Sequence, residues 1–495
     1  MPHKLLRETG IMGNDRCPRS GLRRLGKTSF SMGQFHHGVQ TVFLHIEREA
    51  RMQQQQTQDA LSQDHRGLFY GWWIVIIGCI QDAVKGGTFN TGFTLYFLPI
   101  LTELQLSRAA TSLPFSLAKL ESALEGPLVG YLIDRFDPRV MMILGTICAG
   151  VGFVLLSFTH SYVFFLLVFM GLLTFGFQAG FNHATMAAVN HWFLRKRGLA
   201  MSIVQTGQAI GGVVIFPLVA LAVLNLGWRH AAFLSGVVVF MLLPLALLIR
   251  RSPESMGLLP DGDSRVPVSP SAVVARPVRR LRDIQEYTTR EALRTSTFWL
   301  MAAFHGLRNV PYGGVTVHLV PLLVWKGLDQ PTAAFFVGLM AFSTVIVRPL
   351  TGWLGDRWSK QKIGATGVIL GGLGLVVLTY SNGALWHMVC FVILFSFGDG
   401  INSVTWALVG DFYGRKQFAS IRGWIGMIQS LASMPAAVFT GWIYDQTQSY
   451  TYALMPFIII YGLAGLVLWQ VPRPKRPQSL EASPGQALDI QASRP

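Results

Sequence analysis

The chain has 495 residues, of which 51% are hydrophobic and 13% are charged. This composition leaves too little polar surface to cover a soluble protein of that size, so it excludes a soluble fold and predicts an integral membrane protein. The formal net charge of +16 is expected where basic loops face an anionic leaflet, and it requires no nucleic acid partner.

The first 69 residues predict a disordered cytoplasmic tail. They are polar and contain no short apolar region followed by a small-residue cleavage site, so we expect no signal peptide. Residues 21–28 fit the Walker A pattern, but a phosphate-binding loop needs a hydrophobic strand before its glycines and a helix after them. The residues before this stretch are polar, so we expect no nucleotide binding. A further hypothesis is that Met52, 18 residues before Tyr70, is the natural start.

Twelve windows of about 20 apolar residues, the length of a membrane-spanning helix, follow the tail. They lie at 71–98, 109–131, 140–158, 162–191, 199–224, 228–249, 297–324, 332–353, 363–380, 385–411, 420–443 and 450–470. A polar, basic and proline-containing linker at 251–296 separates the first six windows from the last six, and a second cytoplasmic tail occupies 472–495. The sequence therefore predicts an all-α integral membrane protein with two six-helix bundles, at 70–250 and 297–471.

The basic residues predict the orientation. On the side that carries the N-terminus, the loops and the linker hold twenty lysines and arginines, counting Arg422, against three on the other side. The positive-inside rule then places both termini in the cytoplasm. We expect a monomeric, multi-pass protein of the cell membrane, either an inner or a plasma membrane.

A ten-residue repeat relates the two halves. Residues 126–135 (GPLVGYLIDR) return 222 positions later as residues 348–357 (RPLTGWLGDR), so we expect two pseudo-symmetric bundles that rock against each other around a shared centre. Both copies end in Gly-x-x-x-Asp-Arg. We predict that these ends pair across helices and gate the cytoplasmic side; the alternative is that they only mark the water interface. The predicted gate residues are Gly130, Asp134, Arg135, Gly352, Asp356 and Arg357.

These two copies, with the residues that follow them, resemble the signature found after the second and eighth helices in the major facilitator superfamily. Asp137 stands where glycine is usual, which should stiffen the turn without abolishing it. The resemblance covers about residues 70–471. It implies twelve transmembrane helices in the major facilitator fold, with helices 1, 4, 7 and 10 around the cavity.

Further segments resemble the monocarboxylate and oxalate/formate branch of that family. They are residues 70–73 (YGWW), 192–200 (WFLRKRGLA), 227–229 (GWR) and 348–349 (RP). The resemblance implies that Arg348 binds the substrate carboxylate. Thr344 stands where animal monocarboxylate transporters have an aspartate, and uncharged residues such as Gln429 follow Arg422 in the helix where oxalate exchangers have a lysine. Substrate and coupling ion therefore stay open.

Eight ionisable residues fall well within the predicted helices. They are Asp82, Lys85, Lys119, Glu121, Glu125, Arg308, Arg348 and Asp399. Each would cost about 2.5 to 3.5 kcal/mol at a helix centre if it faced lipid, so they must pair or face water. Asp82 and Lys85 are three residues apart and can pair within one helical turn. Gly86 and Gly87 follow directly. Consecutive glycines loosen a membrane helix and are tolerated where its backbone lines a cavity, so they favour a cavity position for Lys85.

Polar faces on other helices extend this site. In the seventh helix His305, Arg308 and Tyr312 share one face just before Pro311 interrupts the backbone hydrogen bonds. Asp399, Asn402, Ser403 and Trp406 line a face of the tenth helix, and Gln205, Gln208 and Gly212 one of the fifth. The predicted substrate-binding residues are Arg348, Lys85, Arg308, His305 and Tyr312.

Proton coupling would require a buried acid. The candidates are Asp82, Asp399, Glu121 and Glu125. Glu121 and Glu125 lie at i and i+4 and repel each other unless one is protonated or each finds a cation. A shared proton and a static network with Arg308 or Lys119 remain equal alternatives.

No enzyme, metal or cofactor pattern is expected. Cys17, Cys79, Cys148 and Cys390 lie far apart, and three of them fall in apolar helices, so neither a disulfide framework nor a thiolate metal site is indicated. We predict a secondary active transporter of a small organic anion, a mono- or dicarboxylate, that is proton-coupled or exchanges anions. The alternatives are an exporter of amphipathic or cationic compounds and a non-transporting membrane sensor with the same fold.

Overall fold

The computed structural model describes residues 69–103, 108–256, 258–262 and 286–474, and every regular element in these ranges is a helix. The Walker A-like stretch, Met52 and the predicted N-terminal tail up to residue 68 lie outside the described residues. So do residues 263–285 of the linker and residues 475–495 of the second tail.

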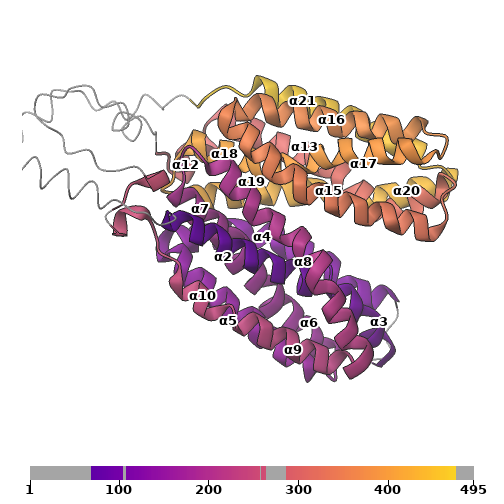
Figure 1. Cartoon of the computed structure of the whole chain (residues 1–495), viewed down its shortest axis with the longest axis horizontal. Helices are drawn as coiled ribbons and strands as arrows, with labels where there is room; N and C mark the ends of the chain where they lie inside the picture. Colours follow the sequence, from indigo (N-terminus) through magenta and orange to yellow (C-terminus); the bar gives the residue numbers. More distant parts are fainter. Residues whose placement is uncertain (1–68, 104–107, 257, 263–285, 475–495) are drawn as a thin grey trace, which may run out of the picture. The chain divides into compact units, whose positions relative to one another are not determined.

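Each of the first six predicted segments corresponds to one helix or to a run of consecutive helices. In order they are α2 (Tyr70–Lys85) with η1 (Gly86–Asn90) and α3 (Phe93–Glu103), α4 (Arg108–Phe136), α5 (Pro138–Ser157), α6 (Tyr162–Val168) with η2 (Phe169–Thr174), η3 (Phe177–Ala184) and α7 (Thr185–Trp192), α8 (Arg197–Leu226), and α9 (Trp228–Phe240) with α10 (Leu243–Leu248). Together they form the N-terminal bundle, drawn in indigo to magenta in Figure 1.

The last six segments form the C-terminal bundle in the same way. They are α13 (Ser296–Val317) with α14 (Leu319–Trp325), α15 (Gln330–Arg357), α16 (Lys360–Tyr380), α17 (Leu385–Gly400) with α18 (Asn402–Tyr413), α19 (Phe418–Ser433) with α20 (Ala436–Thr447), and α21 (Thr451–Gln470). The described parts of the linker contain the short helices η4 (Pro253–Met256), η5 (Pro260–Gly262) and α12 (Thr289–Leu293). The predicted all-helical fold with two bundles is confirmed.

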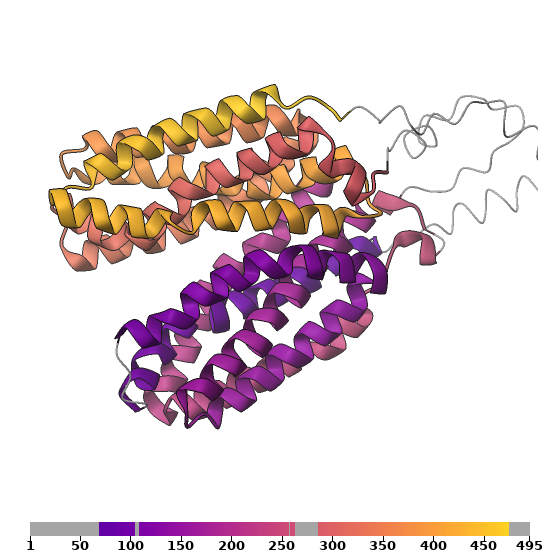
Figure 2. The ribbon, with the colours of Figure 1, turned by 180° about the vertical axis from the view of Figure 1, so that it is seen from behind.

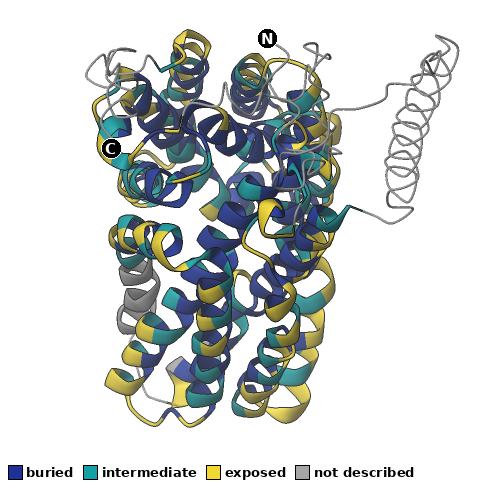
Figure 3. Ribbon diagram, turned by 90° about the vertical axis from the view of Figure 1, so that its left-hand side faces the viewer, coloured by how far each residue is buried: buried dark blue, intermediate teal, exposed yellow. Residues whose placement is uncertain are grey.

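Eight helices among the described residues are long and apolar enough to cross a membrane. The remaining four predicted segments contain Asp82 and Lys85, the acids of α4, Arg308, and Arg422 respectively. Large apolar side chains such as Leu224 and Val438 are exposed. Figure 3 colours the exposed residues along the helices yellow. In a bilayer these side chains face lipid.

Local sequence explains two irregular places. The π-helical turn η1 begins at Gly86, and a Cβ on Gly87 would lie 2.6 Å from the carbonyl oxygen of Gly211 on α8, so glycine permits this close packing. Asp137, in place of the usual glycine, has a φ of 95° and caps α5 by accepting a hydrogen bond from the backbone N–H of Arg139 at 3.0 Å. The cap offsets the strain of the left-handed backbone, and the turn is kept.

The two bundles meet at the end where α7 and α12 lie, and Figures 1 and 2 show the same arrangement from opposite sides. There α4 packs against α19, and α15 packs against α8. Small residues allow the close approach: a Cβ on Gly126 would lie 2.8 Å from the carbonyl oxygen of Gly423, and one on Gly352 would lie 2.7 Å from that of Gly198. The seam between the bundles is therefore closed at the linker end.

Candidate functional site

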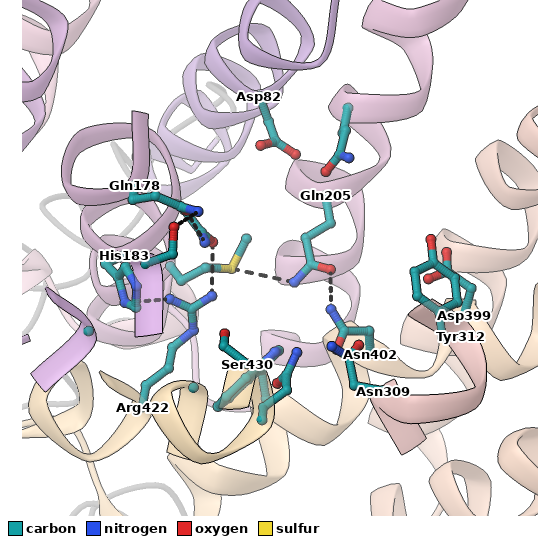
Figure 4. Close-up of a pocket in the computed structure, with 18 of the residues that line it drawn as sticks. Asp82, Gln178, His183, Gln205, Asn309, Tyr312, Asp399, Asn402, Arg422 and Ser430 are labelled. Atoms are coloured by element: carbon teal, nitrogen blue, oxygen red, sulfur yellow. Dashed lines mark hydrogen bonds between the residues drawn. The ribbon is translucent and has the colours of Figure 1, made fainter. Parts of the chain in front are cut away.

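A polar pocket of about 250 Å³ lies between the two bundles. Helices α2, α4, η3, α7 and α8 line it from one side, and α13, α15, α17, α18 and α19 from the other (Figure 4). The charged lining residues are Asp82, Lys85, Arg308, Arg348, Asp399 and Arg422. Uncharged polar lining residues include Ser122, Gln178, Asn182, His183, Gln205, Gln208, Asn309, Tyr312, Asn402, Gln429 and Ser430.

Arg348 and Arg308 share the carboxylate of Asp399. The guanidinium of Arg348 donates to Asp399 Oδ2 from Nε at 3.1 Å and from Nη2 at 2.8 Å. Arg308 forms a longer ion pair with Asp399 Oδ1, at 3.6 Å, and donates to the side chain of Asn402 and to the backbone carbonyls of Gly398 and Asp399. Asp399 therefore balances one of these two positive charges.

Asp82 and Lys85 form the expected pair within one turn of α2. Asp82 Oδ1 lies 3.6 Å from Lys85 Nζ, and both side chains are buried. Both residues line the pocket, as predicted for Lys85. This pair is electrically neutral as a unit.

Arg422 is a charged pocket residue that sequence reasoning missed. It lies in α19, is 5% exposed and lines the pocket, so its assignment to a cytoplasmic loop in the charge count was wrong. It donates to Nδ1 of His183 at 3.0 Å and to Oδ1 of Asn182 at 2.9 Å, and its guanidinium lies 4.8 Å from the centre of the Trp406 ring. Figure 4 shows the guanidinium directed at His183. Among the described residues, no carboxylate pairs with it.

A sequence signal for Arg422 did exist. Arg422, Gly426, Gln429 and Ser430 follow helical spacing, and all four line the pocket. Because Arg422 comes only two residues into its predicted apolar window, it was counted with the basic loop that precedes it. In the structure, α19 already begins at Phe418, and α4 packs against it. Arg422 is therefore buried although it lies near the edge of the apolar window.

The described lining residues carry more positive than negative charge. Lys85, Arg308, Arg348 and Arg422 face two acids, Asp82 and Asp399. With all of them ionised, the pocket has a surplus of two positive charges. A desolvated surplus of this kind is costly unless an anion or water balances it.

Other predicted residues lie outside this lining. His305 is fully buried and stacks on Trp406 with 4.1 Å between ring centroids, so it lies against the far face of a pocket residue. Glu121 and Glu125 are on α4 next to the lining residues Ser122 and Gly126, respectively, but do not themselves line the pocket. Tyr312 does line it. The side chain of Lys119 is outside the described part of the chain.

The two aspartates of the repeat make equivalent contacts across the seam. The carboxylate of Asp134 on α4 accepts backbone N–H hydrogen bonds from Ala419 at 3.2 Å and Ser420 at 2.8 Å, at the start of α19. Asp356 on α15 accepts them from Gly198 and Leu199, both at 2.8 Å, at the start of α8. Each half thus caps a helix of the other half, where the helix dipole favours a negative charge.

The arginines of the repeat stay on their own helices. Arg135 donates to the hydroxyl of Tyr131 at 3.1 Å, and the guanidinium of Arg357 lies 4.2 Å from the centre of the Trp353 ring. The ion pair across the seam joins two other helix residues, Asp411 of α18 and Arg197 of α8, at 2.8 Å. Asp411 also binds Lys360, of its own bundle, at 2.9 Å. Gly130 and Gly352 serve the seam by packing directly against backbone of the opposite bundle.

Two helical bundles around a shared polar pocket are the architecture of many membrane transporters. The chain belongs to the Major Facilitator Superfamily, whose family model matches residues 86–437. This confirms the predicted family and fold, and it makes the protein a transporter and not an enzyme.

Curated relatives point to the predicted branch. The chain is 25% identical to monocarboxylate transporter 6 of Homo sapiens, over 77% of this chain and 76% of that protein. It is also 25% identical to monocarboxylate transporter 12-B of Danio rerio, over 77% and 83% of the two chains. An uncharacterized MFS-type transporter of Bacillus subtilis, YcxA, is 23% identical over 80% and 94%.

Solved structures share the fold at lower identity. The crystal structure of the human organic anion transporter MFSD10 superposes with a TM-score of 0.63 at 13% identity, covering 81% of this chain and all of that chain. FucP in its outward conformation gives a TM-score of 0.59 at 14% identity, covering 80% and 97%. At these identities the likeness concerns the fold alone.

Proposed function

We propose that the chain transports a small organic anion, a mono- or dicarboxylate, by alternating access through the pocket. The observation that carries the proposal is Arg422, a buried pocket arginine whose hydrogen bonds go to the neutral acceptors His183 and Asn182. The surplus of two positive charges in the described lining supports it. So do the names of the relatives, which are monocarboxylate transporters.

Arg422 is the better carboxylate ligand in this conformation. A guanidinium keeps its charge and offers two parallel donors that match a carboxylate. Two donors of Arg348 are already bound to Asp399. A substrate must therefore displace the Asp399 carboxylate before Arg348 can bind the substrate in the same way. Trp406 and His183 hold the Arg422 guanidinium in place, and Lys85 offers a second cation on the opposite wall.

The charge arrangement favours an anion over the alternative of a cationic substrate. A cation would need an unengaged acid in the pocket, but Asp82 is paired with Lys85 and Asp399 with Arg348.

If the linker end faces the cytoplasm, as the distribution of basic residues predicts, the closed seam at that end corresponds to an outward-facing state. We further propose a monomer in the inner or plasma membrane with both termini cytoplasmic. The coupling partner is then H⁺ or a counter-anion.

The test is uptake in proteoliposomes of purified protein, with acetate, L-lactate, pyruvate, oxalate and succinate as labelled probes. Uptake is measured with a pH gradient and with each anion trapped inside. We expect uptake above empty liposomes that is strongly weakened in Arg422→Gln and in Arg348→Gln. Arg290→Gln, which changes an exposed arginine of the linker helix α12, is the matched control. If none of the five probes is taken up under either condition, the anion proposal fails.

Binding without flux would instead favour the sensor alternative. A probe that raises the thermal stability of the protein but is never accumulated or exchanged would give that result. Unchanged affinity for a transported probe in Arg422→Gln would leave the transporter intact and refute the proposed site.

A further inference from the structure

The acids Glu121 and Glu125 of α4 are set apart from every other carboxylate near the pocket. Glu125 is 8% exposed, and neither of its carboxylate oxygens has a hydrogen-bond partner among the described residues. Oε2 of Glu121, one turn earlier, is likewise buried without a partner. By contrast, Asp82, Asp399, Asp134 and Asp356 are each bound to a cation or to backbone N–H groups.

Among the described side chains, no cation contacts Glu121 or Glu125 in an ion pair. The elements that pack against α4 are α19, η3, α5, η2 and α3. Their charged and titratable groups are Arg422, His183, Arg139, Cys148, Tyr96 and Glu103, and those of α4 itself are Arg108, Lys119, Tyr131, Asp134 and Arg135. Arg422 is bound to His183, Glu103 to Arg229, Tyr96 to Ser235 and Arg135 to Tyr131. Among the described side chains, none of these groups is in hydrogen-bond or ion-pair contact with Glu125.

The sequence left open a static ion-pair network of Glu121 and Glu125 with Arg308. Arg308 is instead bound to Asp399 and to the backbone of α17. An ionised carboxylate buried without a cation or donor costs several kcal/mol, so the neutral acid is the stable form of Glu125 in this conformation. A neighbouring acid at i−4 adds to that cost, because two like charges on one helix face repel.

Glu125 lies on the helix that both lines the pocket and forms the seam between the bundles. Ser122 and Gly126, three residues before it and one after it, line the pocket. The backbone of Gly126 also packs against Gly423 of the opposite bundle, and Asp134 lies further along the same helix at the closed seam. Any rocking of α4 against α19 must therefore change what surrounds Glu125, and with it the access of water.

We propose that Glu125, with Glu121 one turn before it, is the site that carries the coupling proton. This rests on the proposed function and names its coupling ion. A proton from water on the side to which the pocket opens binds a carboxylate oxygen of Glu125. The seam then opens, α4 moves relative to α19, and the same proton is released to water on the other side. With a monocarboxylate as substrate, one anion and one proton cross together and no net charge moves.

The first test needs no substrate. Protein in liposomes is treated at neutral pH with dicyclohexylcarbodiimide, an apolar reagent that modifies protonated carboxyl groups in membranes, and the modified residue is mapped by mass spectrometry. We expect modification at Glu125 that falls as the pH is raised. Infrared difference spectra should contain the C=O band of a protonated carboxylic acid that disappears in Glu125→Gln. It should persist in the matched control Asp445→Asn, which changes an exposed acid of α20.

The second test separates coupling from transport, using the five carboxylates named above. In Glu125→Gln we expect accumulation under a pH gradient to fall to the level seen without a gradient, while exchange of internal for external probe is reduced much less. Glu121→Gln should shift the pH dependence of accumulation in the same direction but less far.

Three results would overturn this assignment. One is a Glu125 that is unmodified and contributes no acid band. Another is a Glu125→Gln variant that still concentrates a probe in response to a pH gradient. Wild-type protein that transports a probe independently of pH also refutes it, yet leaves the proposed anion transport standing. Complete absence of uptake of all five carboxylates in the wild type instead refutes the proposed anion transport, on which this assignment rests.

Discussion

Asp399 on α17 accepts hydrogen bonds from both Nε and Nη2 of Arg348 on α15, at 3.1 and 2.8 Å. The two residues are 51 positions apart, and both are buried. Removing the acid leaves two arginines without a carboxylate, and breaking a buried ion pair in this way costs about 3 to 5 kcal/mol. We therefore expect Asp399→Asn to lower the midpoint of thermal unfolding clearly, as measured on purified protein in detergent.

The same helix offers a rescue. Thr344 lies four residues before Arg348 on α15 and is buried, so an aspartate there can reach the same guanidinium. We expect the double variant Asp399→Asn/Thr344→Asp to recover part of the lost stability. A double variant that is less stable than Asp399→Asn alone would show that the position of the acid, and not the charge balance, decides the stability.

Arg422 should matter more for substrate affinity and less for stability than its buried charge alone would indicate, in contrast to Arg348. A hydrogen bond to a charged group contributes about 1.5 to 3 kcal/mol, so Arg422→Gln should weaken the affinity for a transported carboxylate by about tenfold to a hundredfold. Its removal leaves no buried acid unpaired, whereas Arg348→Gln leaves Asp399 with its longer contact to Arg308. We therefore expect Arg422→Gln to lower the unfolding temperature less than Arg348→Gln does.

Transport kinetics and thermal unfolding of the same preparations test this contrast. Arg422→Lys is the control, because it keeps the charge but loses the paired donors. Its affinity for the carboxylate should lie between that of the wild type and that of Arg422→Gln. Equal loss of stability in both glutamine variants would contradict the view that Arg422 lacks a carboxylate partner in the folded protein.

Long apolar windows made the fold predictable. The segments predicted at 199–224 and 450–470 correspond to α8 (Arg197–Leu226) and α21 (Thr451–Gln470), because about 20 apolar residues in lipid have few other ways to satisfy their backbone. The repeat also predicted the equivalent positions of Asp134 and Asp356, which each cap a helix of the opposite bundle.

The partners of the buried charges could not be predicted. Their neutralisation followed from the cost of a charge in lipid, but the choice of Asp399 as the partner of Arg348, 51 positions earlier, depends on how α15 and α17 pack. The π-helical turns η2 and η3 likewise depend on packing against α5. Arg422 was misplaced since an arginine near the edge of an apolar window reads as an interface residue until the neighbouring helix is seen to cover it.

The two caps across the seam should control which end of the transporter is open. Replacing Asp134 or Asp356 by asparagine removes a charge that accepts two backbone N–H hydrogen bonds, so each variant should weaken the closed linker end by about 1.5 to 3 kcal/mol. Spin labels on cysteines placed at Val140 and Lys362, exposed residues of the two bundles near this end, should then report longer distances. The native cysteines are replaced in that background.

Asp445→Asn changes an exposed acid on α20 and serves as the control for that experiment. Its distance distribution should match the parent protein. Because the two caps are equivalent by the repeat, Asp134→Asn and Asp356→Asn should shift the distribution in the same direction; opposite shifts would contradict a shared gating role.

Glu103 joins three segments at the end of the N-terminal bundle away from the linker, beyond the predicted span at 71–98. Its carboxylate accepts hydrogen bonds from Arg229 Nη2 at 2.6 Å and from the Trp228 indole at 2.6 Å, while Arg229 also donates to the carbonyls of Ser157 and Thr159. The Arg229 hydrogen bond, followed by that of Trp228, holds the pKa of Glu103 below its ordinary value. The carboxylate is largely exposed, so the effect on stability is modest.

The sign of the pH effect follows from that shift. A carboxyl group whose pKa is lower in the folded state stabilises the protein above its unfolded pKa, about 4.3 for glutamate, and loses this contribution as the pH falls through the folded value. Glu103→Gln should therefore unfold at a lower temperature than the parent at neutral pH, and the difference should shrink as the medium is made acidic. Thermal unfolding curves of both proteins across that pH range measure it. A difference that is constant with pH would mean that packing of the side chain, and not its charge, stabilises this corner.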